Sequence, residues 1–455
     1  MYCVTKYHVT ENKYPDLFDY CNSMAAKSKL LRNAALFRVR QWFTAQNTDH
    51  LHPLQKEVID EVILTCEKSG KKKPRKIMSY EFLEKLMRCT RNPDYFCGLP
   101  SQTAQWVLKG AVHEFKGWME ALKAYYRDPS AFTGKPEMPG YCKRDLHTFS
   151  ITNQECKIYP RDDGTKYLHF PLTKHTLDLN IPDGAVLKEV KVKPFYGNFQ
   201  IIVTYELRKN IPDRNDVNMA GIDLGVSNIA AFVTNEGSVP LLYKGGAVKA
   251  ANQFFNKNRS KYVGILTKGH DPKYVSTDTK MLRSISRNRT FFMYDELHKI
   301  SCHIVRECIR RNVGIIVIGK NTQWKTKTKM SKESNQKFVQ IPHGTLIHMI
   351  RYKAEREGIR VIEQEESYTS KASFLDSDDI PVYGEEENAE YVFSGTRDKR
   401  LYRSKDGTVI NADINGSANI LRKAFPEAFE GVDVSVLQKV KTVSFYDLHT
   451  GRPNS

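Results

Sequence analysis

An aspartate stands inside an apolar, glycine-flanked stretch of the chain, Gly221-Ile222-Asp223-Leu224-Gly225. The run that begins at Met219 is typical of a buried strand, and a carboxylate in such a strand is costly unless it is paired or bound to a cation. The flanking glycines would let a ligand approach the backbone closely. The motif therefore predicts an acidic ligand-binding site at Asp223.

Two kinds of fold place an aspartate in this way: nucleases of the RNase H type, and ATPases of the actin and sugar-kinase type. The ATPases also need a later glycine-bearing phosphate loop and an adenosine-binding Gly-Gly pair in their second half. The only such pair here, Gly245-Gly246, comes too early in the chain. The nuclease interpretation is therefore favoured.

A second aspartate, Asp413, stands at the start of a short predicted helix within INADINGSANI (410–420). Taken alone, it is typical of an acidic residue that the helix dipole favours in the first turn. Paired with Asp223 in a nuclease-like order, it becomes a metal ligand. Phosphodiester cleavage with two metal ions needs about three carboxylates that converge on Mg²⁺, so a third acid has to be found.

The elements that would position these residues change in type along the chain. Residues 16–130 show helical periodicity, with the basic residues of 27–40 on the side opposite the apolar ones, and 131–210 are short β-rich runs typical of a small barrel. From 218 onward, strands alternate with helices, which argues for a mostly parallel sheet. Within it, Gly314–Asn321 almost matches a phosphate-binding loop, but its apolar interior is typical of a core strand.

Composition narrows the class of protein. The chain has 455 residues, 40% of them hydrophobic, and a formal net charge of +18, with a mean hydropathy of −0.52. Extensive disorder and a membrane-spanning protein are excluded. Nine irregularly spaced cysteines indicate a reducing compartment rather than a disulfide framework. The positive charge favours a polyanionic partner, of which nucleic acid is the commonest.

An ordered set of motifs resembles the transposon-encoded RNA-guided nucleases called TnpB, relatives of the Fanzor proteins and of type V CRISPR effectors. The motifs in the second half are GIDLGVSNIAAF, DELHKISCHIV, IIVIGKN, VIEQEESYTSKASFLD and INADINGSANILRK, and those in the first half are SKLLRNAALFRVRQWF, MPGYCKRD and LKEVKVKPFYGNF. The resemblance covers most of the chain, and the order of the motifs is more specific than any one of them.

The resemblance implies a fold of the α/β and β multi-domain class. An RNase H-like (RuvC) nuclease domain would follow an N-terminal OB-like wedge barrel that carries an inserted helical recognition lobe. The implied divisions are 1–15 and 131–215 for the wedge barrel, 16–130 for the recognition lobe, 216–366 and 408–430 for the nuclease domain, 367–407 for a target-nucleic-acid-binding insert, and 431–455 for a C-terminal tail.

The chain departs from the family pattern at two places. The strand that ends in IIVIGKN usually closes with a catalytic glutamate, and here that position is Gly319. The insert usually carries two Cys-x-x-Cys pairs for Zn²⁺, but no cysteine follows Cys308, and Ala372 stands where the first is expected. We therefore expect no zinc, because a structural site needs four thiolate or imidazole ligands. An apolar cluster would replace it: Phe374, Leu375, Tyr391, Val392, Phe393, Leu401 and Tyr402.

Some relatives, notably Fanzor-like ones, place the missing glutamate just before the Tyr-Thr-Ser segment. Glu366 is our choice for this residue and Glu365 the alternative. The strand at 359–362 should lie beside that at 314–318 in a parallel sheet, so an acid at its carboxyl end can reach the same metal. The alternative without a catalytic role is that this acidic pair belongs to a solvated loop.

The resemblance implies an RNA-guided DNA endonuclease that cuts next to a short flanking motif, with Asp223, Glu366 and Asp413 as its catalytic, metal-binding residues. The metal would be Mg²⁺, with Mn²⁺ as the alternative. Its partners would be a guide RNA and double-stranded target DNA, with one guide per monomer and no membrane contact. We expect a bacterial, cytoplasmic, nucleoid-associated protein. The alternatives are a nuclease-dead RNA-guided DNA-binding repressor and an unguided nuclease or RNA-binding protein.

Three basic segments are predicted to contact nucleic-acid backbones. A solvated charge run is equally favoured for the first of them, whereas the contact is modestly favoured over a solvated surface for the other two. They are 68–76, 283–289 and 321–338.

Overall fold

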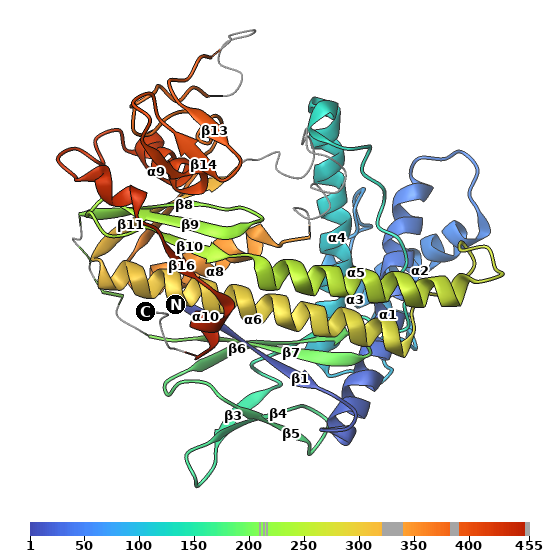
Figure 1. The fold of residues 1–455 in the computed structure, drawn as a ribbon. Helices are drawn as coiled ribbons and strands as arrows, with labels where there is room; N and C mark the ends of the chain where they lie inside the picture. The colour runs from blue at the N-terminus through green and yellow to red at the C-terminus, as the bar shows by residue number, and fades with distance from the viewer. Residues whose placement is uncertain (209–210, 213, 215–216, 321–339, 383–390, 451–455) are drawn as a thin grey trace. The chain divides into compact units, whose positions relative to one another are not determined.

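The computed structural model describes residues 1–208, 211–212, 214, 217–320, 340–382 and 391–450. Its internal contacts divide the chain into two compact units, Met1–Lys209 and Asn210–Ser455, which are described separately (Figure 1). Among the described helices, none combines the length and the apolar character that crossing a membrane requires. The segment 321–338, which we predicted to contact nucleic acid, lies outside the described residues.

The helices of the first unit are α1 (Pro15–Ala45), α2 (Pro53–Ser69), α3 (Tyr80–Cys89), α4 (Ser101–Arg127) and the short 3₁₀ turn η1 (Pro129–Ala131). Local sequence explains several of their ends. His52 and Gln55 form a capping box at the start of α2, and Gly70 ends that helix with a φ of 66°, a left-handed conformation that glycine adopts without strain. The helices therefore begin and end where their local sequence favours it.

The sequence placed the basic residues of 27–40 on the side opposite the apolar ones, but two of these residues are buried. Arg32 and Arg38 are only 8% and 7% exposed. Arg32 pairs with Glu114 of α4, and Arg38 pairs with Glu61 of α2 at 2.6 Å. A buried charge is stable only when it is paired. These two arginines therefore connect α1 to α4 and α2 through buried ion pairs.

The strands of the first unit form two antiparallel sheets. One has the order β1-β7-β6-β2 and the other β3-β4-β5, so the hydrogen bonds within 1–208 do not close the single barrel that we expected. Alternate residues of β7 are buried, which is the period-two pattern of a strand with one face on a core. The strands are β1 (Tyr2–Val9), β2 (Phe149–Thr152), β3 (Lys157–Pro160), β4 (Lys166–His169), β5 (Thr176–Leu179), β6 (Val186–Phe195) and β7 (Asn198–Glu206).

A six-stranded sheet with the order β12-β11-β8-β9-β10-β16 is the centre of the second unit. β11 is parallel to β8 and to β12, whereas β9 is antiparallel to β8 and β10. The strands are β8 (Asn218–Asp223), β9 (Asn228–Thr234), β10 (Leu241–Lys244), β11 (Val313–Lys320), β12 (Arg360–Glu365) and β16 (Lys441–Val443). The sheet is therefore mixed, and β8, β11 and β12 end at the same edge.

Helices cover both faces of this sheet, as Figure 1 shows. Ile316 and Ile318 of β11 pack with the apolar residues of α6 and α8, whereas Val317 packs with Ile420 and Leu421 of α9 on the other face. The helices are α5 (Gly246–Thr267), α6 (Lys280–Arg310), α8 (His343–Arg356), α9 (Ala412–Ala424) and α10 (Phe445–Thr450). The predicted core strand in 314–318 is confirmed, and it excludes a phosphate-binding loop there.

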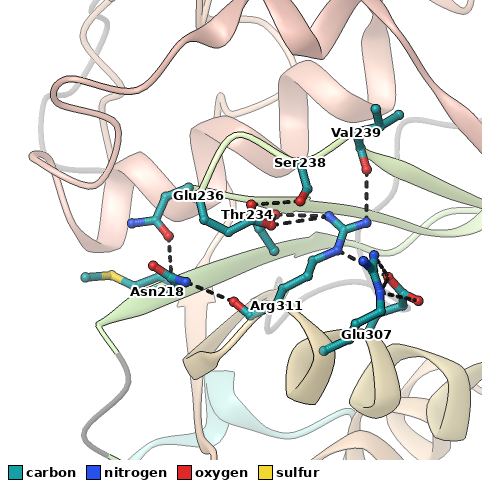
Figure 2. A network of polar contacts seen from close by, with 10 residues as sticks. Asn218, Thr234, Glu236, Ser238, Val239, Glu307 and Arg311 are labelled. Atoms are coloured by element: carbon teal, nitrogen blue, oxygen red, sulfur yellow. Dashed lines mark hydrogen bonds and ion pairs between the residues drawn. The ribbon is translucent and has the colours of Figure 1, made fainter.

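Arg311, directly after α6, joins that helix to the sheet through a buried polar network (Figure 2). Its guanidinium donates to Thr234 Oγ1 at 3.0 Å and to the Val239 carbonyl at 3.1 Å. It also donates to Glu307 Oε2 at 3.2 Å. Because the side chain is only 6% exposed, these partners compensate for its desolvation and fix the end of α6 against β9.

A small antiparallel sheet follows β12 in the chain, formed by β13 (Thr396–Asp398), β14 (Leu401–Arg403) and β15 (Val409–Asn411). After α9, the 3₁₀ turn η2 (Val434–Gln438) leads to β16, which pairs with β10 in parallel. The segment 431–455, which we expected to be a tail, therefore supplies the edge strand of the central sheet as well as α10.

Candidate active site

Asp223 is the last residue of β8, at the edge of the sheet where β11 and β12 also end. The close approach of α9 explains the glycine two residues before it, because a Cβ at position 221 would meet the Ser417 carbonyl. Ser417 also donates from its hydroxyl to the Gly221 carbonyl at 2.7 Å. We expected Gly221 to make room for a ligand, but the structure shows that it makes room for a helix.

Asp413 lies in the first turn of α9, where the Asn411 side chain caps the helix by accepting from the Asp413 amide. The Asp413 carboxylate accepts a hydrogen bond of 2.7 Å from Asn228 Nδ2. Its other oxygen lies 3.4 Å from Arg397 Nη2. Asp413 is therefore held from two sides, by β9 and by β13 of the small sheet.

Glu366 follows directly after β12, and its carboxylate lies beside Gly319 of β11. Glu366 Oε2 is 3.1 Å from the position that a Cβ of residue 319 would occupy. β11 and β12 are parallel neighbours in which Gly319 is paired with Gln364. A carboxylate from residue 366 thus lies in the space into which a side chain at 319 would project.

The three predicted acids are close enough to influence one another's charge. The pKa of Asp223 is raised to about 8, chiefly by burial and then by the charges of Glu366 and Asp413, whereas Arg397 opposes the shift. Like charges in a partly buried site disfavour ionisation. The structure therefore brings Asp223, Glu366 and Asp413 together as one acidic cluster.

The donor chemistry of this cluster fits a divalent cation. Carboxylate oxygens are the ligands that Mg²⁺ prefers, and a cation would relieve the repulsion that raises the pKa of Asp223. As the side chains stand, however, no group of three or more His, Cys, Asp or Glu residues in the described ranges is spaced to hold a metal ion. The three side chains would therefore have to move closer together to hold an ion.

Glu365 points to different partners. Its carboxylate accepts from Lys423 Nζ at 2.7 Å and from the Ser367 amide at 2.6 Å. Burial raises the pKa of Glu365, but these hydrogen bonds outweigh burial and leave the pKa below its usual value. Glu365 is thus engaged in an ion pair with α9, whereas the charge of Glu366 acts on Asp223 and raises its pKa.

Sequence reasoning missed two polar residues of this site. Arg397 comes from β13 and pairs with Asp413, and Asn228 begins β9 and donates to the same carboxylate. Asn228 lies within the motif GIDLGVSNIAAF, and its place three residues after Gly225 was the signal that could have found it. Arg397 belongs to none of the motifs, and only the folding of β13 against the start of α9 brings it to Asp413.

The asparagines of the motif 410–420 have a structural role. Asn415 Nδ2 donates to the Ala372 carbonyl at 2.8 Å, and Asn419 Nδ2 donates to the Thr369 and Ala372 carbonyls at 2.9 and 2.7 Å. Both side chains are fully buried. At spacing i, i+4 they lie on one face of α9 and hold the segment that follows Glu366.

The insert at 367–407 is held by a smaller apolar cluster than we predicted. Phe374 and Tyr402 are buried, but Val392 is 95% exposed and Leu401 is 52% exposed. Carboxylates complete the packing: Asp378 accepts from the Ser373 and Ser394 amides, and Asp376 accepts from the Lys405 amide. Hydrogen bonds from backbone amides to aspartates thus connect the turns of this insert.

The other two basic segments that we predicted to contact nucleic acid are described in part by their internal contacts. In 68–76, the Arg75 carbonyl accepts from Trp42 Nε1 at 2.9 Å. In 283–289, Arg289 donates to Asn252 Oδ1 at 2.7 Å, and Arg283 pairs with Asp278 at 2.5 Å. Both segments therefore have partners within their own unit, and their contacts to nucleic acid remain predictions.

Two family models match ranges of the chain that contain the acidic cluster. The family model OrfB_IS605, described as a probable transposase, matches residues 202–325, and the Cas12f1-like TNB domain matches 343–420. The TnpB-like protein ORF457 of Acidianus two-tailed virus is 25% identical over 242 residues, covering 50% of this chain and 45% of the viral protein. The chain thus matches about half the length of this curated relative.

The fold as a whole is similar to that of a cryo-EM structure of a Cas12f1–sgRNA–target DNA complex. The TM-score is 0.53 at 12% identity, over 90% of this chain and 84% of that chain. A second cryo-EM structure, of a CRISPR-Cas12f ternary complex, matches at a TM-score of 0.32 and 13% identity over 90% of this chain and 83% of that one. The first of these matches shows a shared multi-domain fold.

Proposed function

Because this chain is a TnpB-type protein, we propose that it is an RNA-guided endonuclease that hydrolyses target DNA next to a short flanking motif. The observation that carries the proposal is the acidic cluster of Asp223, Glu366 and Asp413. Its three members come from the ends of β8 and β12 and from the start of α9, so only the folded unit assembles them.

The topology of the second unit supports a nuclease domain of the RNase H-like, RuvC type. Three antiparallel strands, β10, β9 and β8, continue into the parallel strands β11 and β12. The acids lie at the carboxyl ends of β8 and β12, which is where open α/β sheets bind their ligands. By the same resemblance, the strands of the first unit would form the wedge and α1–α4 the recognition lobe.

Asp223, Glu366 and Asp413 would hold Mg²⁺ in this function. The metal would supply positive charge to the scissile phosphate and lower the pKa of the attacking water. Glu366 takes the role that Gly319 cannot fill, because its carboxylate lies over that glycine. Asn228 orients Asp413 through the 2.7 Å hydrogen bond to its carboxylate. Arg397 offsets part of the negative charge of the cluster.

Guide RNA and target DNA are the proposed partners. The net charge of +18 supports a polyanionic partner. When Lys and Arg side chains neutralise nucleic-acid phosphates, counterions are released, and this release strengthens binding at low salt. In such systems, base pairing with the guide reads the target sequence while the protein reads a short flanking motif and the duplex shape. The guide RNA would therefore select the target sequence, and this chain would select the flanking motif.

The test begins with the RNA that copurifies when the protein is expressed together with its flanking genomic sequence. We expect one defined RNA species, whose affinity for the protein falls steeply with salt. That RNA, reprogrammed to a plasmid carrying a library of flanking sequences, should direct Mg²⁺-dependent cutting beside one flanking motif. Protein that elutes free of nucleic acid at low salt and binds no offered guide would overturn the RNA-guided assignment.

The nuclease-dead repressor is the second candidate, and the specific observation that favours it is the glycine at position 319. The same plasmid experiment separates the two functions. Guided binding at the flanking motif without any cleavage in Mg²⁺ or Mn²⁺ would select the repressor. Cleavage that Asp223→Asn abolishes while guided binding persists would select the endonuclease.

A further inference from the structure

An open cavity of about 980 Å³ lies along α6, apart from the acidic cluster. Its wall on α6 includes Asp295, His298, Cys302, Arg306 and Arg310. Their spacing of three or four residues places these side chains on one face of the helix. Asp223, Glu366 and Asp413 do not line this cavity, so the proposed nuclease function does not use it.

The network at Arg311 makes one part of this wall rigid. Ser238, Val239, Glu307 and Arg311, which Figure 2 shows, all line the cavity. The Arg311 guanidinium donates to the Val239 carbonyl at 3.1 Å and to Glu307 Oε2 at 3.2 Å. A cavity with such a wall keeps its shape without a ligand, as small-molecule sites usually do.

Cys302 is the nucleophilic side chain of the cavity. Its Sγ lies 3.1 Å from Lys353 Nζ, which comes from α8, and 3.7 Å from His298 Nδ1. Lys353 Nζ also donates to the His298 carbonyl at 2.8 Å, which holds the ammonium beside the sulfur. The thiol is therefore part of a cluster with a lysine and a histidine, and it is partly exposed to the cavity.

This environment favours the thiolate form. The hydrogen bond with His298 lowers the pKa of Cys302 most; burial opposes the change, and Lys353 adds to it, so that the pKa is about 7. By contrast, burial raises the pKa of Cys21, Cys156 and Cys308. Thiolates are the reactive form of cysteine, so Cys302 is set apart from these three thiols at neutral pH.

The lining of the cavity carries five Lys and Arg side chains against three acids, which are Asp295, Glu307 and Asp447. Lys299 pairs with Asp295, and Arg310 pairs with Glu307. Arg306 and Lys441, in contrast, form no ion pair with any residue that the structure describes. Burial, Arg306 and Lys441 lower the pKa of His303, whereas Glu307 and Asp447 oppose this shift. The net positive charge of the lining attracts an anion to the mouth of the cavity.

We propose that Cys302 is a thiol-modification site that reacts selectively with negatively charged, low-molecular-weight disulfides. The Cys302 thiolate attacks one sulfur of the disulfide R–S–S–R. A bond forms between the two sulfurs, the R–S–S–R bond breaks, and R–S⁻ leaves with the electron pair. Cys302 is thereby oxidised to a mixed disulfide, and one half of the reagent is reduced to the free thiolate.

Each neighbouring residue has a separate role in this reaction. Lys353 stabilises the attacking thiolate, and Arg306 and Lys441 draw in the charged reagent. The ion pair of Lys299 with Asp295 makes Lys299 a suitable control, because its charge is already compensated. The adduct would displace Lys353 from Cys302 and so loosen a contact between α6 and α8, the helix that precedes β12.

The experiment compares a dianionic disulfide, 5,5′-dithiobis(2-nitrobenzoate), with the neutral 4,4′-dithiodipyridine on the full-length protein at pH 7. Peptide mapping of the briefly treated wild type should locate the first adduct on Cys302. Arg306→Gln combined with Lys441→Gln should slow the dianionic reagent about tenfold, with little change for the neutral one. Lys299→Gln should change neither rate appreciably. Lys353→Met should slow both reagents, because it destabilises the thiolate.

Two results would overturn the proposal. A first adduct on another cysteine, such as Cys142, in the wild-type protein would remove Cys302 from the role of nucleophile. Equal slowing of both reagents in the Arg306→Gln and Lys441→Gln variant would remove the selectivity for anions. Circular dichroism of each variant shows whether it is folded, and the mapping of the wild type decides the assignment even if a variant fails to fold.

Discussion

The carboxylate of Glu366 lies over the α-carbon of Gly319: its Oε2 is 3.1 Å from the point where a Cβ on residue 319 would stand. The two residues are far apart in sequence but meet because β11 and β12 are parallel neighbours. An acid that follows β12 can therefore serve the same site as an acid at the end of β11.

Glu366→Gln should abolish guided cleavage, whereas Glu365→Gln should retain most of it. Glutamine keeps the size of the side chain but loses the charge that holds Mg²⁺. Glu365 is engaged with Lys423 instead, so its substitution should affect stability more than cleavage. The measurement is the rate of plasmid cutting with a matched guide. Full activity of Glu366→Gln together with loss in Glu365→Gln would reverse the assignment.

Moving the acid back to position 319 should need a second change in α9. A Cβ at 319 would meet Ile420 Cγ1 at 3.2 Å and Cδ1 still more closely. Gly319→Glu with Glu366→Gln should therefore restore weak cleavage only when Ile420→Val removes the Cδ1 methyl, at a cost of about 0.5–1.5 kcal/mol in stability. The control is Ile420→Val alone, which should cut like the wild type. Equal activity with and without Ile420→Val would refute the steric argument.

Arg397→Gln should tighten Mg²⁺ binding. Arg397 pairs with Asp413 at 3.4 Å, and its positive charge competes with a cation for the same carboxylates. The pair is partly exposed, so we expect a gain of about 1.4- to fivefold in affinity, which corresponds to an exposed ion pair worth about 0.2–1 kcal/mol. Calorimetric titration with Mg²⁺ measures this without catalysis. Arg400→Gln, on the same exposed edge, is the control, and weaker binding in Arg397→Gln would contradict the prediction.

Asn419→Ala should lower the free energy of unfolding by about 1–3 kcal/mol, because it removes the donor to the Thr369 carbonyl and leaves the Ala372 carbonyl with Asn415 alone. Urea denaturation of the full chain measures the change. Cleavage should fall as well, because this segment follows Glu366 directly. Glu427→Ala, on the exposed turn after α9, should leave both quantities unchanged. A wild-type stability for Asn419→Ala would show that these bonds contribute little.

The insert should keep its fold in the presence of chelators. Its turns are connected by Asp376 and Asp378, and packing around Phe374 and Tyr402 completes it. Incubation with a strong zinc chelator should leave the melting temperature unchanged, whereas Asp378→Ala should lower it through the loss of hydrogen bonds to two backbone amides. Stoichiometric zinc in elemental analysis of the purified protein would contradict this prediction.

Much of the second unit could be predicted from sequence. The apolar run at 314–318 and the alternation of strands with helices from 218 onward are local patterns, and β11 and the other elements of the unit formed in these ranges. Periodicity predicts these elements correctly because burial of one face contributes most to the stability of an element. The spacing of apolar residues along the chain shows which face is buried.

Other features depended on partners distant in sequence. Periodicity placed Arg32 and Arg38 on the side opposite the apolar residues, but it could not show that they pair with Glu114 of α4 and Glu61 of α2. The segment 431–455 read as a tail because the edge strand β16 has only three residues, too few for a pattern. Gly221 read as room for a ligand, yet Ser417 of α9 fills that space. The residues of one element do not show which distant element it packs against.

The sequence by itself determined the types of the acids, the order of their motifs and the absence of zinc-binding cysteines after Cys308. Only the tertiary structure decided between Glu365 and Glu366 as the neighbour of Asp223, and only it brought in Arg397 and set Cys302 beside Lys353. The physical reason is that strand pairing and helix packing fix side-chain directions and distances between segments. Chemistry that needs contacts of a few ångströms therefore appears only when those segments meet.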